Sequence, residues 1–375
     1  MLNHQVDSTF YVAAAGSGKT KRLVDIATSY KDGKVLLTTF TRQNIEEIHK
    51  RIAVKGFSKN IRVLPWYTFL LQQCIQPYQG CLTRKRISGL HWIEGRSGIV
   101  QGKNGRIINL HDETKREYFL DSSWRVYSDK ASKLALKIDD LSSGESIARL
   151  ARAYSAILVD EVQDMVGYDL EILGRISRIV RKTVFAGDPR QKTYETHKDS
   201  KNKKFSHGGI ADYFASQWAG IKIDTTSLST NYRSNSDICK FSDLLYPLMP
   251  ASVSGVSFSD VHQGVYYVRE SEIDQYLDEY RPMQLRDSIK RQVSTRCPVM
   301  NFGDAKGGAF ERVLVYPTEP MTKWLLNHAV ELKQQSRARL YVAVTRAIKS
   351  VGFVVDDKTA RRLDIGASDL RHWLG

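Results

Sequence analysis

Residues 13–20 of the chain read AAAGSGKT, and this stretch limits the possible folds more than any other. The run TFYV at positions 9–12 predicts a buried strand before it, and a helical pattern follows to about Tyr30. A strand, a glycine loop and a helix form the setting in which backbone N–H groups and a helix N-terminus bind phosphate. We expect Lys19 to bind the β- and γ-phosphates of ATP and the Thr20 hydroxyl to bind Mg²⁺. The full set of candidate phosphate-loop ligands is Ala15, Gly16, Ser17, Gly18, Lys19 and Thr20.

A second motif places two carboxylates after an apolar strand. Residues 156–164 read AILVDEVQD, and the four apolar residues predict a strand buried on both faces. Such a strand delivers Asp160 and Glu161 to the carboxyl edge of a parallel sheet. We expect Asp160 to complete the Mg²⁺ site and Glu161 to position or deprotonate an attacking water. The next strand, at 183–186, ends in GDPRQ and brings the Gln191 amide to the same edge, within reach of a γ-phosphate.

Strands and helices alternate along most of the chain, which predicts an α/β fold with parallel, doubly wound sheets. Residues 80–150 break this alternation with a basic cluster at 84–86 and glycine-rich turns, and we expect a small inserted subdomain there. The basic cluster either contacts a phosphate backbone or is solvated. The expected domains are 1–79 with 151–220, the insertion 80–150, and a second α/β domain at 221–375. The sequence also predicts a helix at 273–280 and strands at 35–39, 61–64, 265–268, 312–316 and 351–355.

The charge balance is basic. Lys plus Arg outnumber Asp plus Glu by 56 to 41, which gives a net charge of +15 and a pI near 9.5. A field of this sign attracts polyanions, so nucleic acid is the expected partner, although a solvated basic surface would give the same count. The four cysteines form no CxxC pair, which favours reduced thiols without zinc or disulfides. No apolar signal segment or 18-residue apolar run occurs, so we expect a cytoplasmic protein with no membrane partner.

Taken in order, the motifs resemble those of superfamily 1 DNA helicases of the UvrD, Rep and PcrA type. AAAGSGKT resembles the first motif of that family, TFTRQNIEEIHKRI its Ia, VDEVQD the second and GDPRQKTY the third. LSTNYRS resembles the fourth, DAKGGAFERVLVY the fifth and LYVAVTRA the sixth, and the matches run from residue 9 to about 350. The resemblance implies two RecA-like P-loop NTPase domains, with ATP in the cleft between them and single-stranded DNA across their tops.

The resemblance also implies roles for residues outside the phosphate loop. Arg233 and Arg346 would act as arginine fingers on the γ-phosphate, and an ordinary salt bridge is the alternative for either one. Tyr232 would stack on the adenine. Lys21 stands where relatives have the arginine opposite that tyrosine, and Gly307 belongs to the fifth motif, at the nucleotide.

Four residues match family positions that face DNA, where aromatic rings stack on bases without regard to sequence. They are Phe40, Thr41, Thr68 and Tyr194. For Phe40 and Thr68, packing in the core is an equally open interpretation.

The chain departs from the family pattern at several positions. Ala13 replaces the usual first glycine of the phosphate loop, and Gln5 lies too close to it to match the adenine-reading glutamine well. Ala309 replaces a ribose-contacting glutamate, so we expect looser recognition of base and sugar. Thr196 replaces a base-stacking tryptophan. The stretch 236–300 is too short for the large accessory domain called 2B, which we expect to be missing.

These observations predict an ATP- and Mg²⁺-dependent translocase or helicase on single-stranded DNA with 3′ to 5′ polarity. RNA suits the same stacking surfaces. The alternative is a regulatory ATPase that senses nucleic acid and works with a partner, such as a nuclease or a replication or repair factor, without unwinding DNA. No aromatic-tipped hairpin follows the sixth motif in the sequence, so we expect the isolated chain to unwind duplexes only weakly.

Overall fold

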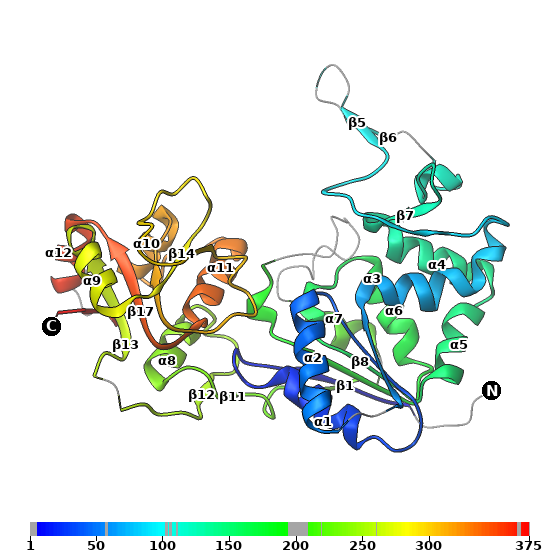
Figure 1. Ribbon diagram of the computed structural model, residues 1–375, viewed down its shortest axis with the longest axis horizontal. Helices are drawn as coiled ribbons and strands as arrows, with labels where there is room; N and C mark the ends of the chain where they lie inside the picture. Colours follow the sequence, from blue (N-terminus) through cyan, green and yellow to red (C-terminus); the bar gives the residue numbers. More distant parts are fainter. Residues whose placement is uncertain are drawn as a thin grey trace. The chain divides into compact units, whose positions relative to one another are not determined.

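The computed structural model describes residues 6–56, 59–101, 104, 107–109, 112–193, 209–218, 220–259, 261–365 and 369–374 (Figure 1). The chain divides into two compact units. Unit 1 comprises Met1–Tyr11, Thr20–Gly187 and Glu195–Asp224, and unit 2 comprises Val12–Lys19, Asp188–Tyr194 and Thr225–Gly375. The phosphate loop and the segment after residue 187 therefore pack with unit 2, although the strands that lead into them belong to unit 1.

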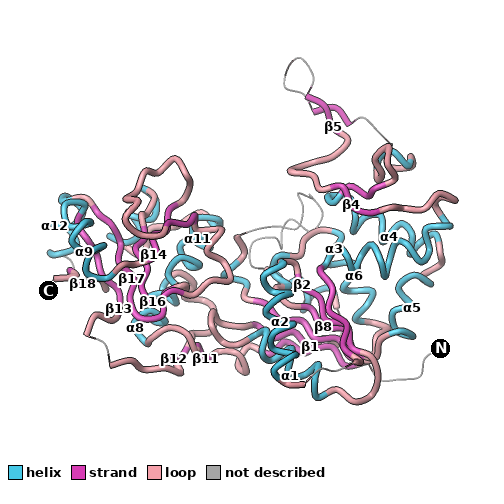
Figure 2. The backbone as a smooth tube through the Cα atoms, in the orientation of Figure 1, coloured by secondary structure: helices cyan, strands magenta, loops and turns pink. Residues whose placement is uncertain are grey.

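Unit 1 contains a six-stranded sheet in the order β10-β1-β9-β8-β2-β3. Figure 2 shows β1, β8 and β2 of this sheet beside one another. Its strands are β1 (Asp7–Val12), β2 (Val35–Thr39), β3 (Ile61–Pro65), β8 (Ala156–Val159), β9 (Lys182–Gly187) and β10 (Lys222–Asp224). The register is parallel, with Val35 opposite Ile61 on one side and Ala156 on the other. Every residue of β2 and β8 is buried, as expected for central strands of a sheet covered on both faces. The strands predicted at 35–39 and 156–159 are confirmed without a shift.

Helices cover both faces of this sheet. On one face, Val184 packs in a core with residues of α1 (Lys19–Ser29) and α2 (Arg42–Val54). The next residue, Phe185, points to the other face, where its ring lies 5.5 Å from Phe214 of α7 (Ile210–Gln217). Consecutive residues of a strand point to opposite faces, so the predicted doubly wound arrangement is confirmed. On the second face α6 (Tyr168–Ser177) also packs against β9.

The segment after β3 starts with three consecutive helical pieces and continues into the predicted insertion. The pieces are α3 (Trp66–Phe69), the π-helix η1 (Leu70–Ile75) and the 3₁₀ helix η2 (Gln76–Cys81). The insertion contains β4 (Gly89–His91) paired in parallel with β7 (Arg125–Tyr127), and an antiparallel pair of β5 (Ile99–Gln101) and β6 (Ile107–Asn109). It also contains the short helices η3 (Arg116–Tyr118) and η4 (Ser128–Lys130), followed by α4 (Ala131–Leu141). The next helix, α5 (Glu145–Ala153), extends past the predicted end of the insertion at residue 150.

The helices α4 and α5 join the body of unit 1. Both pack against η1 and α6. Polar groups lock this junction, because the buried Asp169 of α6 accepts hydrogen bonds from Trp66 Nε1 at 2.9 Å and from the Ser132 hydroxyl. The junction therefore fixes the base of the insertion against the helices that cover the first sheet.

Unit 2 contains a second six-stranded sheet in the order β15-β14-β16-β17-β13-β18, with parallel pairing throughout. Its strands are β13 (Gly264–Arg269), β14 (Met283–Arg286), β15 (Val299–Asn301), β16 (Phe310–Val315), β17 (Ala347–Val355) and β18 (Arg371–His372). A separate parallel pair joins β11 (Thr230–Asn231) to β12 (Val253–Ser254). The α/β class, with two parallel sheets, is thus confirmed.

Alternation along β13 again places helices on two faces. Tyr267 packs with α8 (Ser236–Leu244), α10 (Glu319–Leu326), α11 (Gln334–Val344) and α12 (Asp357–Ile365). Its neighbours Tyr266 and Val268 pack with α9 (Ile273–Tyr280), which follows the short helix η8 (Glu270–Glu272). The predicted helix 273–280 is confirmed. Within the described residues, no helix has the length and apolar character needed to span a membrane.

Candidate nucleotide-binding site

The phosphate loop needs glycine at two positions for backbone reasons. Gly16 has φ +68° and Gly18 has φ +81°, in the region that side chains with a Cβ rarely adopt. Gly16 is also crowded, because a Cβ there would lie 2.4 Å from Asn231 Oδ1 and 2.9 Å from Arg233 Cβ. The Tyr232 N–H donates to the Gly16 carbonyl at 3.0 Å. The fourth motif therefore packs directly on the loop.

Ala13 stands in place of the usual first glycine of the phosphate loop, and its backbone conformation explains why alanine fits there. Ala13 is not among the described non-glycine residues with positive φ, so this position does not require glycine. Its side chain is buried, with 1% exposed. Ser17 is the member of the loop that fits a ligand most directly: it is 5% exposed and its Oγ has no hydrogen-bond partner among the described residues. A buried hydroxyl of this kind, two residues before α1 begins, fits a phosphate oxygen.

In unit 1, the Thr20 hydroxyl donates to Asp160 Oδ2 at 2.6 Å. Asp160 follows β8 and is fully buried, and its other carboxylate oxygen accepts the Glu161 N–H at 2.9 Å. Glu161 has φ +55°, a strained conformation for a residue with a side chain. The Gln163 amide donates to the Glu161 carboxylate and holds it. The structure therefore brings together the three predicted residues Thr20, Asp160 and Glu161.

The donor set that Thr20 and Asp160 form in unit 1 fits Mg²⁺. Mg²⁺ prefers hard oxygen ligands and usually keeps waters and phosphate oxygens in its shell, so one or two protein ligands suffice. The Thr20 hydroxyl and the Asp160 carboxylate supply such oxygens. Across the part of the chain that the structure describes, no cluster of three or more His, Cys, Asp or Glu side chains could hold a metal ion by itself.

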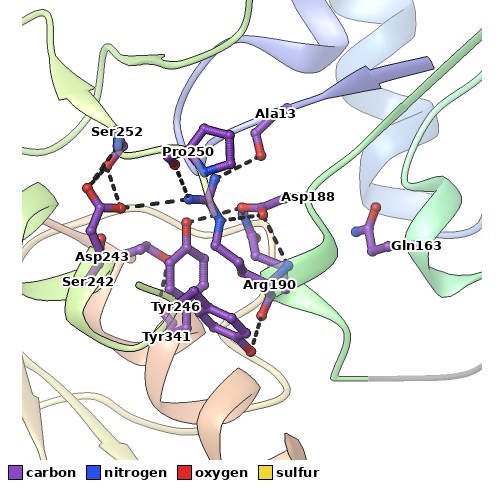
Figure 3. Close-up of polar contacts among 12 residues, drawn as sticks. Ala13, Gln163, Asp188, Arg190, Ser242, Asp243, Tyr246, Pro250, Ser252 and Tyr341 are labelled. Carbon is purple, nitrogen blue, oxygen red and sulfur yellow. Dashed lines mark hydrogen bonds and ion pairs between the residues drawn. The ribbon is translucent and has the colours of Figure 1, made fainter. Parts of the chain in front are cut away.

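In unit 2, the carboxylate of Asp188 is the centre of a buried network (Figure 3). It accepts hydrogen bonds from Arg190 Nε at 2.9 Å, Gln191 Nε2 at 2.8 Å and the Tyr341 hydroxyl at 3.2 Å. Asp188 follows β9, Arg190 and Gln191 lie in the 3₁₀ turn η6 (Pro189–Gln191), and Tyr341 lies in α11. One carboxylate thus fixes side chains of the third and sixth motifs.

Arg190 is a component that the sequence analysis did not select. Only 3% of its side chain is exposed, and it donates to the carbonyl oxygens of Ala13 at 3.1 Å and Pro250 at 3.3 Å. Asp243 of α8 lies 3.7 Å away. Burial by itself lowers the pKa of Arg190, but Asp188 and the other nearby acidic groups outweigh it and raise the pKa. For Asp243, burial raises the pKa of the carboxyl, although the nearby charge of Arg190 acts in the opposite direction.

The two predicted arginine fingers are held by main-chain and amide oxygens. Arg346 is 2% exposed and donates to Gln191 Oε1 at 3.0 Å and to the Gly308 carbonyl at 3.3 Å. Arg233 donates to the Thr345 carbonyl at 3.0 Å. The structure therefore brings the predicted residues Gln191 and Arg346 into direct contact, and it ties Arg233 to the residue beside Arg346.

Three further predicted nucleotide residues have distinct environments. Tyr232 is 65% exposed, so its ring is available for stacking. The ring also packs on Gly255, where an added Cβ would lie 2.9 Å from the Tyr232 ring. Gly307 has φ +89°, which explains the glycine. Lys21 is 66% exposed and pairs with Asp25 one turn along α1 at 3.6 Å.

The predicted DNA-facing residues of unit 1 follow neighbouring strands. Phe40 follows β2 and is half-buried, with its ring 5.9 Å from Tyr67. Thr41 is the N-cap of α2, where its hydroxyl accepts the Asn44 N–H at 3.2 Å. Thr68 is half-buried in α3. Tyr194 lies outside the described residues, as does Thr196.

The sheets and the loop define a phosphate-loop protein of the α/β class. A family model described as "AAA domain" matches residues 3–197, more than half of the 375 residues, and the chain belongs to that family. No curated protein sequence matches the chain.

Among solved structures, the chain is similar to Arterivirus nonstructural protein 10 (helicase), with 14% identity and a TM-score of 0.48. This alignment covers 95% of the chain and 61% of the viral protein. A complex of that protein with DNA has the same identity and TM-score, with 96% and 62% covered. The chain thus spans about three fifths of the length of these proteins.

Proposed function

We propose that the chain is an ATP- and Mg²⁺-dependent motor that moves along single-stranded DNA in the 3′ to 5′ direction. The observation that carries the proposal is the 2.6 Å contact between the Thr20 hydroxyl and Asp160. It joins the phosphate loop to the carboxylate strand in the arrangement that P-loop NTPases use for a magnesium nucleotide. The basic charge and the resemblance of seven ordered motifs to superfamily 1 helicases support nucleic acid as the partner.

In this proposal Lys19 binds the β- and γ-phosphates, and Ser17 donates its unpartnered hydroxyl to a phosphate oxygen. Glu161 positions or deprotonates the attacking water, a role that its fixed carboxylate supports. Arg346, already hydrogen-bonded to Gln191, stabilises the charge that develops on the γ-phosphate, with Arg233 as the second cation. The exposed ring of Tyr232 stacks on the base.

ATP hydrolysis measured in parallel with no polymer, single-stranded DNA, duplex DNA and RNA tests the proposal. We expect hydrolysis to require Mg²⁺ and to rise most with single strands, because stacking surfaces need unpaired bases. Hydrolysis that ignores every nucleic acid would contradict the motor and also the regulatory ATPase that senses nucleic acid. Hydrolysis that single strands stimulate, without movement along the strand, would support the regulatory ATPase. Displacement of streptavidin from one or the other end of a biotinylated strand then tests the polarity.

A further inference from the structure

Trp92 is the one exposed tryptophan of this chain. All six tryptophans lie in the described residues; 63% of Trp92 is exposed, whereas the others are buried or half-buried. It directly follows β4 in the insertion. A large aromatic ring that the fold leaves open to water is available to stack on a planar ligand.

Trp92 continues a row of aromatic rings that begins at the first sheet. Its ring lies 4.9 Å from Tyr67 with the planes at 84°, and Tyr67 lies 5.9 Å from Phe40. Tyr67 is 4% exposed, and burial raises the pKa of its hydroxyl, so a fixed, neutral ring supports Trp92. Phe40 and Tyr67 follow the adjacent parallel strands β2 and β3. The row therefore starts at the carboxyl edge of the sheet, where α/β proteins bind ligands.

The stretch of chain that carries Trp92 is basic. Positions 84–137 contain 12 Lys and Arg but only 6 Asp and Glu, a balance of +6. Among these, Arg84, Lys85, Arg86 and Arg96 are exposed. An exposed aromatic ring on a basic segment suits single-stranded nucleic acid, which offers unpaired bases for stacking and phosphates for the cations.

We propose that Trp92 stacks on a base of single-stranded nucleic acid and extends the strand-binding surface from Phe40 onto the insertion. This proposal rests on the proposed function, because it assigns a further contact to the same strand. The stack uses the exposed part of the Trp92 ring, while Tyr67 holds the ring in place.

Intrinsic fluorescence tests the contact directly, because a base stacked on the exposed indole quenches its emission. Titration of the full chain with oligothymidine, and with oligouridine in a parallel arm, should quench the wild type. Trp92→Phe should remove most of that quenching while it retains most of the affinity, since a phenyl ring still stacks. Equal quenching in the wild type and Trp92→Phe would overturn the proposal.

Binding of an end-labelled oligothymidine, followed by anisotropy, gives the second readout. Trp92→Ala should weaken binding about 5- to 140-fold, the range that corresponds to ~1–3 kcal/mol per stacked base. Leu248→Ala, at a fully exposed apolar residue of unit 2, is the matched control and should bind like the wild type. If the wild type binds and Trp92→Ala binds equally well, the proposal for Trp92 is wrong and the motor stands. If the wild type binds no single strand, both are wrong.

Discussion

Removal of the Arg190 guanidinium should destabilise the chain far more than removal of a surface arginine. Arg190 is 3% exposed and its Nε lies 2.9 Å from Asp188, which is fully buried. Arg190→Ala removes the cation that contacts this buried carboxylate, although Gln191 and Tyr341 still donate to it. Breaking a buried pair by removing one partner costs about 3–5 kcal/mol. We expect a loss in that range for Arg190→Ala.

Urea unfolding followed by circular dichroism measures this loss. The same loss can be read as a change in Tm on heating. In a unit of about 150–250 residues, ~1 kcal/mol corresponds to about 2–4 °C, so the Tm of the variant should be roughly 6–20 °C lower than that of the wild type. Arg181→Ala is the matched control, since Arg181 pairs with Asp32 at 3.7 Å with both side chains more than half exposed. Such surface pairs contribute about 0–1 kcal/mol. If Arg190→Ala lost no more than this control, the buried contact of Arg190 with Asp188 would not stabilise the fold more than a surface pair does.

A conservative variant separates charge from geometry. Arg190→Lys keeps the cation but loses the planar fork that serves Asp188, Ala13 and Pro250 together. We expect its stability to lie between those of the wild type and Arg190→Ala. Stability equal to the wild type would mean that charge alone is required, and the hydrogen bonds to the two carbonyls would then contribute nothing measurable.

Four further predictions follow from the site and the charge. Lys19→Ala should abolish ATP hydrolysis and Glu161→Gln should leave nucleotide bound but uncleaved; a near-normal rate in either variant would contradict the assignment. Arg233→Ala and Arg346→Ala should each lower turnover, by up to about 10³ to 10⁵, with little effect on nucleotide affinity; a change in affinity alone would exclude a finger role. Affinity for single strands should fall with salt at a log–log slope of about −0.7 per phosphate contacted, and a flat response would point to a protein ligand instead. Burial and nearby arginines lower the pKa of His262 to about 4. The unfolded chain therefore binds a proton there first, and stability should decline as pH falls from about 6.5 towards 4; His262→Phe should flatten this part of the urea-unfolding profile.

The strands that carry the site could be predicted because their signals are local. The run at 156–159 is apolar throughout and short, so a buried parallel strand is the natural interpretation, and the following carboxylates come with it. The glycines of the loop could likewise be predicted, because positive φ restricts the residue type. These features depend on neighbours in sequence.

The sequence analysis selects neither Arg190 nor Trp92, because their roles depend mainly on contacts with residues that are distant in sequence. Arg190 donates to Ala13, 177 positions away, and to Pro250, 60 positions away. In a basic chain with 56 Lys and Arg, nothing local marks one arginine as buried. Trp92 differs from the buried tryptophans only in the packing around it, although its position in a basic stretch is a signal that could have selected it.

The Asp188 network also determines how variants of the finger arginine should be interpreted. Arg346 donates to Gln191, Gln191 donates to Asp188, and Asp188 also accepts from Tyr341, which lies five residues before Arg346. Arg346→Ala therefore removes a cation and also leaves the buried Gln191 amide oxygen without a donor, at a cost of about 1–3 kcal/mol. Groups in one network are not additive. The loss of turnover in Arg346→Ala is consequently an upper limit on what its charge contributes at the γ-phosphate, because part of that loss comes from a misplaced Gln191.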